Sequence, residues 1–126
     1  MADIIKHNEF ESTYDDPDHP IPSLTHLEVC TMLKGGGAEL HIVIAKPLQS
    51  DEYSLNRLLD KIEKYLVHIR SPGFIAEAGA PSPEKTSIVV DIHPESCEEA
   101  FKLLENSKEW VKENLASLKV KRLVDG

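Results

Sequence analysis

Apolar and polar side chains alternate along two neighbouring segments of the chain, residues 24–33 and residues 38–45. A period of two places successive side chains on opposite faces, so each segment is predicted to form a half-buried strand. Three glycines follow Lys34 and separate the two segments. A tight hairpin turn requires positive φ angles, which glycine adopts without steric cost. The pattern therefore predicts a β-hairpin.

The register of this hairpin is predicted from the requirement that the two apolar faces coincide. A two-residue turn formed by the first two glycines places Val29 opposite Ile42. The same turn places Cys30 opposite His41, so that polar side chains also meet on one face. A phosphate-binding loop is the alternative interpretation of Lys34 and the glycines, but it requires a helix directly afterwards, and here a strand follows.

Two longer segments show the helical spacing of apolar residues. Residues 50–70 carry leucine and isoleucine at intervals of three and four, and Ser-Pro-Gly ends the pattern. Residues 94–118 repeat this spacing and predict a second helix. Between the helices we expect a loop over residues 74–85 and an alternating strand over residues 86–93. The basic residues 119–124 are predicted to form a last strand at the edge of the sheet.

The predicted element order is therefore ββαβαβ. Strand–helix–strand units favour parallel neighbours, whereas the hairpin is antiparallel, so the sheet is mixed. A strand covered by helices on both faces would be apolar throughout, but the third strand carries Ser87, Asp91 and His93 on one side. We predict an α/β protein, a two-layer sandwich of α+β type. Its four-stranded sheet has two helices on one face, and the other face is open.

Residues 1–23 differ from the rest of the chain and are predicted to form an N-terminal arm, followed by a single domain over residues 24–126. The arm holds six of the 22 acidic residues and three prolines, which disfavour regular structure. It also contains apolar side chains that a solvated acidic tail would lack. These residues are Ile4, Ile5, Phe10 and Ile21. We expect them to pack across the open face of the sheet or onto a second subunit.

The 126 residues carry a formal net charge of −8, which argues against binding to the phosphate backbone of nucleic acids. No segment approaches the ~20 apolar residues of a membrane-spanning helix, and the first residues lack the features of a secretory signal. The two cysteines form no Cys-x-x-Cys motif, so we expect a cytoplasmic protein with free thiols. Composition thus favours neither a nucleic-acid partner nor a membrane partner.

The open face of the predicted sheet gathers side chains that bind ligands in other proteins. Under the predicted register, the candidate binding residues of this face are His26, Glu28, Cys30, Glu39, His41, Asp91 and His93. Such nitrogen, sulfur and oxygen donors bind zinc and similar metals, but their spacing matches no known metal-binding motif. The alternative is a polar face that is solvated or packed against another subunit. No metal or other cofactor is therefore assigned.

Cys97 lies at the start of the second predicted helix, four residues after His93. The helix N-terminus and a nearby imidazolium favour a thiolate nucleophile. Three neighbouring glutamates oppose the thiolate, and Cys97 also belongs to the apolar stripe of its helix. A nucleophilic role and a structural role both remain open. The sequence contains no Ser-His-Asp arrangement, dinucleotide-binding motif or Walker loop to accompany a nucleophile.

Three parts of the chain carry a resemblance: the hairpin "LEVCTMLK…AELHIVIAK", the helix end "YLVHIRSPG" and the segment "SIVVDIHPESCEEAFKLLE". In element order and texture they resemble small bacterial α/β proteins classed as a domain of unknown function. The resemblance covers about residues 24–124 and implies a bacterial cytosolic protein. It implies no activity, cofactor or site residue. The acidic arm departs from the short N-termini of that group.

We expect a non-enzymatic binding, interaction or regulatory module that acts through the open sheet face. That face mixes apolar with polar side chains, and a second copy of the chain is the commonest cover for such a patch, so we expect a homodimer. The acidic arm favours a protein partner with a basic surface. The alternative is a metal- or thiol-dependent enzyme that uses the histidine, cysteine and acidic residues of the same face.

Overall fold

A computed structural model describes residues 15–123 of the chain. The strands of this range are β1 (Val29–Met32), β2 (Ala38–Ile44), β3 (Thr86–Ile92) and β4 (Ser117–Arg122). The helices are α2 (Glu52–His68), α3 (Pro72–Ala78) and α4 (Glu98–Glu113). The strands form one sheet in the order β1-β2-β3-β4, in which β1 is antiparallel to β2 and the other neighbours are parallel.

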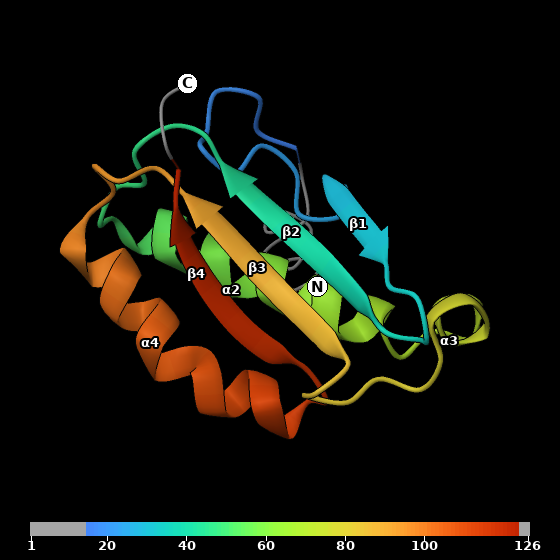
Figure 1. Cartoon of the computed structure of the whole chain (residues 1–126). Coiled ribbons are helices and arrows are strands. Elements are labelled where there is room, and N and C mark those ends of the chain that lie inside the picture. The colour runs from blue at the N-terminus through green and yellow to red at the C-terminus, as the bar shows by residue number, and fades with distance from the viewer. Residues whose placement is uncertain (1–14, 124–126) are drawn as a thin grey trace, which may run out of the picture.

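Helices α2 and α4 lie on one side of the sheet and leave its opposite face open (Figure 1). The predicted ββαβαβ order, the mixed four-stranded sheet and the α/β class are therefore confirmed. The last strand begins at Ser117, two residues before the predicted start, and occupies the predicted position at the edge of the sheet. None of the helices in residues 15–123 has both the length and the apolar character that crossing a membrane requires.

The core lies between the sheet and the two long helices. Alternate side chains of β2 and β3 reach it because a strand presents every second residue to the same face. The buried residues of these strands and helices include Leu40, Ile42, Ile44, Ile88, Val90, Ile92, Leu58, Ile62, Leu66, Leu104 and Val111. Each such side chain contributes roughly 1.5–3 kcal/mol when fully buried. This burial determines which residues of β2 and β3 are left on the open face.

The register of the hairpin differs from the predicted register by one residue. Val29 lies opposite His41 rather than Ile42, and Cys30 lies opposite Leu40 rather than His41. Because side chains alternate along a strand, this shift moves every side chain of β1 to the opposite face of the sheet. The predicted register is therefore wrong, and so is the predicted position of Glu28 and Cys30 on the open face.

The length of the hairpin turn explains the one-residue difference in register. The Leu33 N–H donates to the carbonyl of Gly37 at 3.1 Å, and the Gly36 N–H donates to the carbonyl of Leu33 at 3.2 Å. The loop therefore comprises residues 34–36, and Lys34 is part of it. All three glycines have positive φ angles, as their composition suggested, but the loop is longer than the predicted two-residue turn.

Gly37 has a role of its own at the start of β2. Its N–H donates to the carbonyl of Ala78 at 2.7 Å, and the next N–H, that of Ala38, donates to the carbonyl of Lys85 at 2.9 Å. A Cβ atom on Gly37 would lie 2.3 Å from the Lys85 oxygen. Gly37 thus allows the backbone before β3 to approach the start of β2 closely.

Helix α3 occupies part of the region that was predicted to be a loop, residues 74–85. Ser71 accepts a hydrogen bond from the Phe74 N–H, and Pro72 occupies the first turn, where its missing N–H is no disadvantage. Phe74 and Ala78 are buried against the core. The Ser-Pro-Gly sequence that was interpreted as a helix end is therefore also a helix start.

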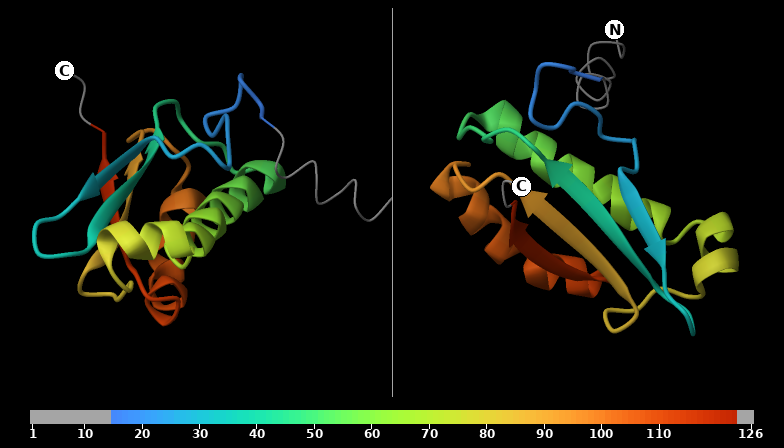
Figure 2. Two further views of the ribbon diagram at one scale, coloured as in Figure 1. Left: turned by 90° about the vertical axis from the view of Figure 1, so that its right-hand side faces the viewer. Right: turned by 45° about the horizontal axis from the view of Figure 1, so that its top comes forward.

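Residues 15–28 lead into β1 and run beside α2 (Figure 2). Ile21 and Leu24 are buried in the main core on the helix side of the sheet. This part of the arm therefore does not cross the open face, contrary to one of the two predicted positions. The other apolar arm residues of the prediction lie outside the described residues: Ile4, Ile5 and Phe10.

Two basic side chains of α2 hold this segment by its backbone. Arg57 Nε donates to the Ile21 carbonyl at 2.5 Å. Lys61 Nζ donates to the carbonyls of Ser23 and His26, at 2.5 and 2.9 Å. Both basic side chains are only 1% exposed. Because α2 binds these carbonyls, the chain becomes a strand only at Val29, five residues after the predicted start at residue 24.

Candidate functional site

The structure separates the seven candidate residues into different surroundings. Glu39, His41 and Asp91 lie together on the open face of the sheet, on β2 and β3. Cys30 pairs with Leu40 and packs against the core on the helix side, contrary to prediction. The cause is the one-residue difference in the hairpin register.

Glu28 also lies on the helix side, where its carboxylate has a structural role. Oε1 accepts a hydrogen bond from the Val43 N–H at 3.1 Å, at a point of β2 beyond the end of the β1 pairing. Oε2 forms an ion pair with Lys61 Nζ at 2.6 Å. Glu28 therefore satisfies one backbone donor and one buried cation, and it is not a residue of the open face.

The two remaining histidines lie in loops at the ends of strands. His26 is exposed before β1, and its backbone N–H donates to Ser23 Oγ at 3.1 Å. His93 follows β3, and its Nδ1 accepts a hydrogen bond from the Glu95 N–H at 3.0 Å. Neither imidazole contacts the group on the open face in the described structure.

His41 is the centre of that group. Its Nδ1 lies 2.5 Å from Asp91 Oδ2, and its Nε2 lies 2.9 Å from Glu39 Oε1. Glu39 is two residues away on β2 and so shares the same face, while Asp91 lies on β3 opposite Val43. A carboxylate only accepts hydrogen bonds, so this geometry is satisfied when both ring nitrogens donate. The arrangement is therefore that of an imidazolium held between two carboxylates.

The protonation equilibria agree with this assignment. Burial disfavours the charged ring, but the hydrogen bonds to Asp91 and Glu39 outweigh that effect and raise the pKa of His41 above its usual 6.5. The hydrogen bond from His41 is the main factor that lowers the pKa of Glu39 below its usual 4.5. His41 and Asp91 are each 17% exposed, so the group lies at the surface but is not fully solvated.

Strand β4 adds two cations to the same face. Lys121 lies opposite Asp91, and Lys119 lies opposite Val89. The charges of both lysines also favour the ionised form of Glu39 and lower its pKa further. Val89 is fully buried although it belongs to the open face, with His41 and Lys119 as its neighbours in register. We call Glu39, His41, Asp91, Lys119 and Lys121 the open-face network.

The hydrogen bonds of His41 leave neither of its ring nitrogens free to coordinate a metal ion. Both ring nitrogens of His41 are engaged with carboxylates, so neither presents a free lone pair to a cation. Within residues 15–123 no group of three or more histidine, cysteine or acidic side chains has a geometry that could hold a metal. The seven candidate binding residues therefore do not come together as a metal site in the described part of the chain.

Neither cysteine belongs to the group on the open face. Cys97 is the N-cap residue of α4, but its side chain makes no capping hydrogen bond, and its N–H donates to the Leu48 carbonyl. The neighbouring Ser96 Oγ accepts a hydrogen bond from the Leu48 N–H. Burial and the charge of Glu77 raise the pKa of Cys30, which disfavours its thiolate. Both cysteines are free.

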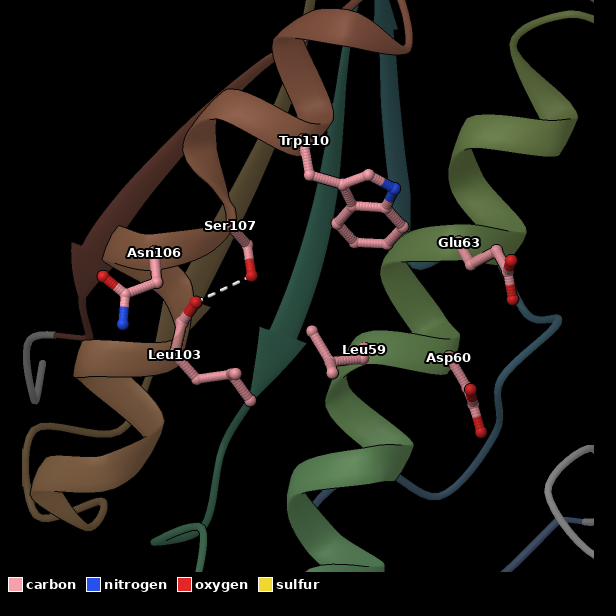
Figure 3. A pocket seen from close by; sticks show the side chains of 7 residues that line it. All are labelled: Leu59, Asp60, Glu63, Leu103, Asn106, Ser107 and Trp110. Carbon is pink, nitrogen blue, oxygen red and sulfur yellow. Dashed lines mark hydrogen bonds between the residues drawn. The ribbon is translucent and has the colours of Figure 1, made fainter.

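A second candidate surface lies between α2 and α4, in the helix layer (Figure 3). It is a groove of about 420 Å³ whose apolar lining comes from Leu59, Leu103 and Trp110. Asp60 and Glu63 add two acids on the α2 side, and burial together with the Glu63 charge raises the pKa of Asp60. The sequence did not reveal the groove, because its residues come from two helices that are distant in the chain.

The sequence also did not place the β4 lysines beside the carboxylates of the open face. It predicted a basic edge strand over residues 119–124, but the position of Lys121 beside Asp91 depends on the β3–β4 register. The basic alternation of residues 119–122 was the available signal, since it places Lys119 and Lys121 on one face.

No family model, no curated protein and no solved structure matches the chain. The resemblance to small bacterial α/β proteins therefore stays a prediction from the sequence, and the site has to be interpreted from its own geometry.

The open-face network predicts a pH-dependent stability. We expect His41→Gln to lower the free energy of unfolding by roughly 0.5–1 kcal/mol near pH 6, a modest value because solvent screens the network. A pKa raised on folding contributes stability below the unfolded value of 6.5, and the contribution is lost as pH rises through the folded pKa. Urea denaturation should therefore show a smaller difference from the wild type near pH 9 than near pH 6.

The contribution of Glu39 to stability depends on pH in the opposite direction. The lowered pKa of Glu39 means that its contribution is present above 4.5 and is lost as pH falls through its folded pKa. The exposed His26 provides the matched control, and His26→Gln should have little effect at any pH. A destabilisation by His41→Gln that is the same at every pH would contradict the assignment of an imidazolium.

Proposed function

We propose that this protein is a non-enzymatic binding module that docks another protein on the open face of its sheet. The observation that supports this proposal is the open-face network, in which two acids and three cations are arranged across β2, β3 and β4. The side chains of Glu39, His41 and Asp91 are fixed by hydrogen bonds to one another. Fixed polar side chains lose little conformational entropy on binding, which favours a docking surface.

The chemistry of the network favours binding over catalysis. A general base needs a free lone pair on an accessible nitrogen, and both nitrogens of His41 are engaged with carboxylates. The alternative of a metal- or thiol-dependent enzyme on this face fits less well, because Cys30 and Glu28 lie on the helix side of the sheet. The charges instead suit electrostatic complementarity, which sets the orientation and specificity of a protein partner.

The expected partner presents alternating charges. An acidic group of the partner would lie over Lys119 and Lys121, and a basic group would lie over the Glu39 carboxylate, which is 35% exposed. The net charge of −8 favours encounter with a partner whose overall surface is basic. We place this binding in the cytoplasm of a bacterium and without a cofactor. The two free cysteines, which suit a reducing compartment, and the sequence resemblance support that location.

Charge reversal on β4 tests the proposal. Wild-type protein, the double variant Lys119→Glu/Lys121→Glu and the control Lys102→Glu/Lys108→Glu are immobilised and exposed to a lysate of the source cells. The control changes the net charge equally, but its lysines lie on α4 in exposed pairs with Glu98 and Glu105. Quantitative mass spectrometry then identifies proteins that the wild type and the control retain and the β4 variant does not.

The decisive measurement is the affinity of the retained protein after purification. Calorimetry should show that the β4 variant binds about tenfold or more weakly and that the control binds like the wild type. A partner that binds all three proteins equally would contradict docking on the open face. Retention that is lost equally in both double variants would indicate a nonspecific charge effect and would contradict the proposal as well.

A further inference from the structure

We propose that two copies of this chain pair antiparallel through the outer edge of β1, so that two sheets join into one. The inference does not depend on the proposed function, because it rests on a different surface. A dimer of this kind also leaves the open face available to a partner. The sequence led us to expect that a homodimer would cover that face.

The two edges of the sheet differ in how they are protected. Within the described part of the chain, β1 and β4 each have a strand neighbour on one side only. Edge strands normally carry charges that prevent pairing with another chain, and β4 carries three, Lys119, Lys121 and Arg122. Residues 29–33 carry no charge, and three apolar side chains of this run are largely exposed: Val29 at 46%, Met32 at 42% and Leu33 at 46%.

Some backbone N–H and C=O groups of β1 point away from β2, which pairing with a second chain requires. The Leu33 N–H donates inward to Gly37 of the same hairpin. Successive residues of an antiparallel strand alternate between inward and outward groups, so Val29 and Thr31 also point toward β2. The N–H and C=O groups of Cys30 and Met32 therefore point outward, toward the edge that lacks a described neighbour.

The side-chain faces require the twofold axis of the dimer to pass through a residue of β1 and not between two residues. Residues directly opposite each other in an antiparallel pair must lie on the same face of the sheet. An axis through Thr31 places Cys30 opposite the partner's Met32, and both residues have outward backbone groups that can bond. The same axis places Val29 opposite the partner's Leu33, so that apolar side chains meet on the open face as well.

The neighbouring axis is less favourable. An axis through Cys30 would place Met32 opposite the partner's Glu28, an apolar side chain against a carboxylate. The axis through Thr31 avoids that contact, because it places the exposed Met32 opposite the partner's Cys30 and the exposed Val29 opposite the partner's Leu33. The exposed apolar residues of β1 therefore favour the axis through Thr31.

The surface beside β1 provides room for the partner's hairpin. A pocket of about 350 Å³ adjoins the segment that precedes β1, and its lining includes Thr25, Leu27 and Val67. Val67 is among the exposed large apolar residues of the chain. Figure 2 shows β1 and its hairpin loop at the border of the molecule, with α3 near the loop rather than alongside the strand. Antiparallel pairing directs the partner's hairpin loop toward this pocket.

Light scattering of the full chain gives the first test. At tens of micromolar the wild type should show twice the monomer mass of 14.1 kDa. Val29→Lys should shift the protein to the monomer mass, because a charge on the edge opposes pairing. Leu115→Lys is the matched control, since it adds the same charge at an exposed apolar residue next to β4, and it should remain dimeric. Circular dichroism confirms that both variants are folded.

A disulfide gives the second test and reports the register. Thr31 lies on the proposed axis at a non-hydrogen-bonded pair, where the two Cβ atoms come close enough for a disulfide. Thr31→Cys should form a covalent dimer on mild oxidation, whereas Thr25→Cys should not. A monomeric wild type, a Val29→Lys variant that stays dimeric, or a covalent dimer formed through native Cys30 in place of residue 31 would each overturn the proposal.

Discussion

Replacing Gly37 with alanine should lower the free energy of unfolding by about 3 kcal/mol or more. The added Cβ would lie 2.3 Å from the Lys85 carbonyl oxygen, far inside van der Waals contact, and the backbone of both residues is fixed by hydrogen bonds. The φ angle of 96° adds a steric penalty of about 1–2 kcal/mol for any residue with a Cβ. The variant therefore has to move the start of β2 away from the segment before β3.

The neighbouring Gly35→Ala variant separates these two contributions. Gly35 has a similar φ angle of 87°, but a Cβ there would meet no atom within 4 Å. Gly35→Ala should therefore lose only about 1–2 kcal/mol, the backbone penalty alone. Urea denaturation of both variants and the wild type measures the difference. Equal losses at the two positions would show that the close approach of Gly37 to Lys85 is relieved without penalty.

Replacing Lys61 with methionine should lower the free energy of unfolding by about 3–5 kcal/mol. Its ammonium group is buried and binds two backbone carbonyls and the Glu28 carboxylate. Removal of the cation leaves that carboxylate partly buried without its charge partner and leaves the carbonyls of Ser23 and His26 without this donor. Most of the loss therefore comes from the polar groups that remain, and little comes from the ion pair itself.

Lys64→Met is the matched control, because Lys64 lies on the same helix and forms no ion pair within residues 15–123. It should change stability by less than about 0.5 kcal/mol. The double variant Lys61→Met/Glu28→Gln should recover part of the loss, since the uncompensated negative charge is removed. A loss for Lys61→Met no larger than that for Lys64→Met would mean that water replaces the ammonium group at no cost.

The layer architecture was predictable because period-two and helical patterns are long and unambiguous in this chain. Residues 38–45 and 86–93 alternate over a full strand length, and their apolar sets are the ones that are buried. Glu39, His41 and Asp91 were therefore assigned to the correct face. Their positions depend only on the parity of strands that are covered by helices on one side.

The first strand was not predictable in the same way. The alternation continues through residues 24–28, but the His26 carbonyl of that segment accepts hydrogen bonds from Lys61 and Tyr65 of α2, and the segment pairs with none of the described strands. The parity of β1 then depends on the number of residues in a loop that contains three glycines, each of which adopts a positive φ angle. Turn chemistry alone does not determine which two of these residues close the hairpin. Glu28 and Cys30 were misplaced for this reason.

Because α2 binds residues 21–26 through their backbone, the exposed side chains of this segment can be substituted without loss of the attachment. Arg57 and Lys61 hold residues 21–26 through carbonyl oxygens, which every amino acid possesses. The attachment therefore specifies the path of the chain without selecting its exposed side chains, whereas Ile21 and Leu24 on the same path are buried in the core. Thr25 and His26 point to solvent from a path that is fixed independently of their identity. This edge of the molecule can thus acquire new recognition chemistry by substitution while the scaffold beneath it is preserved.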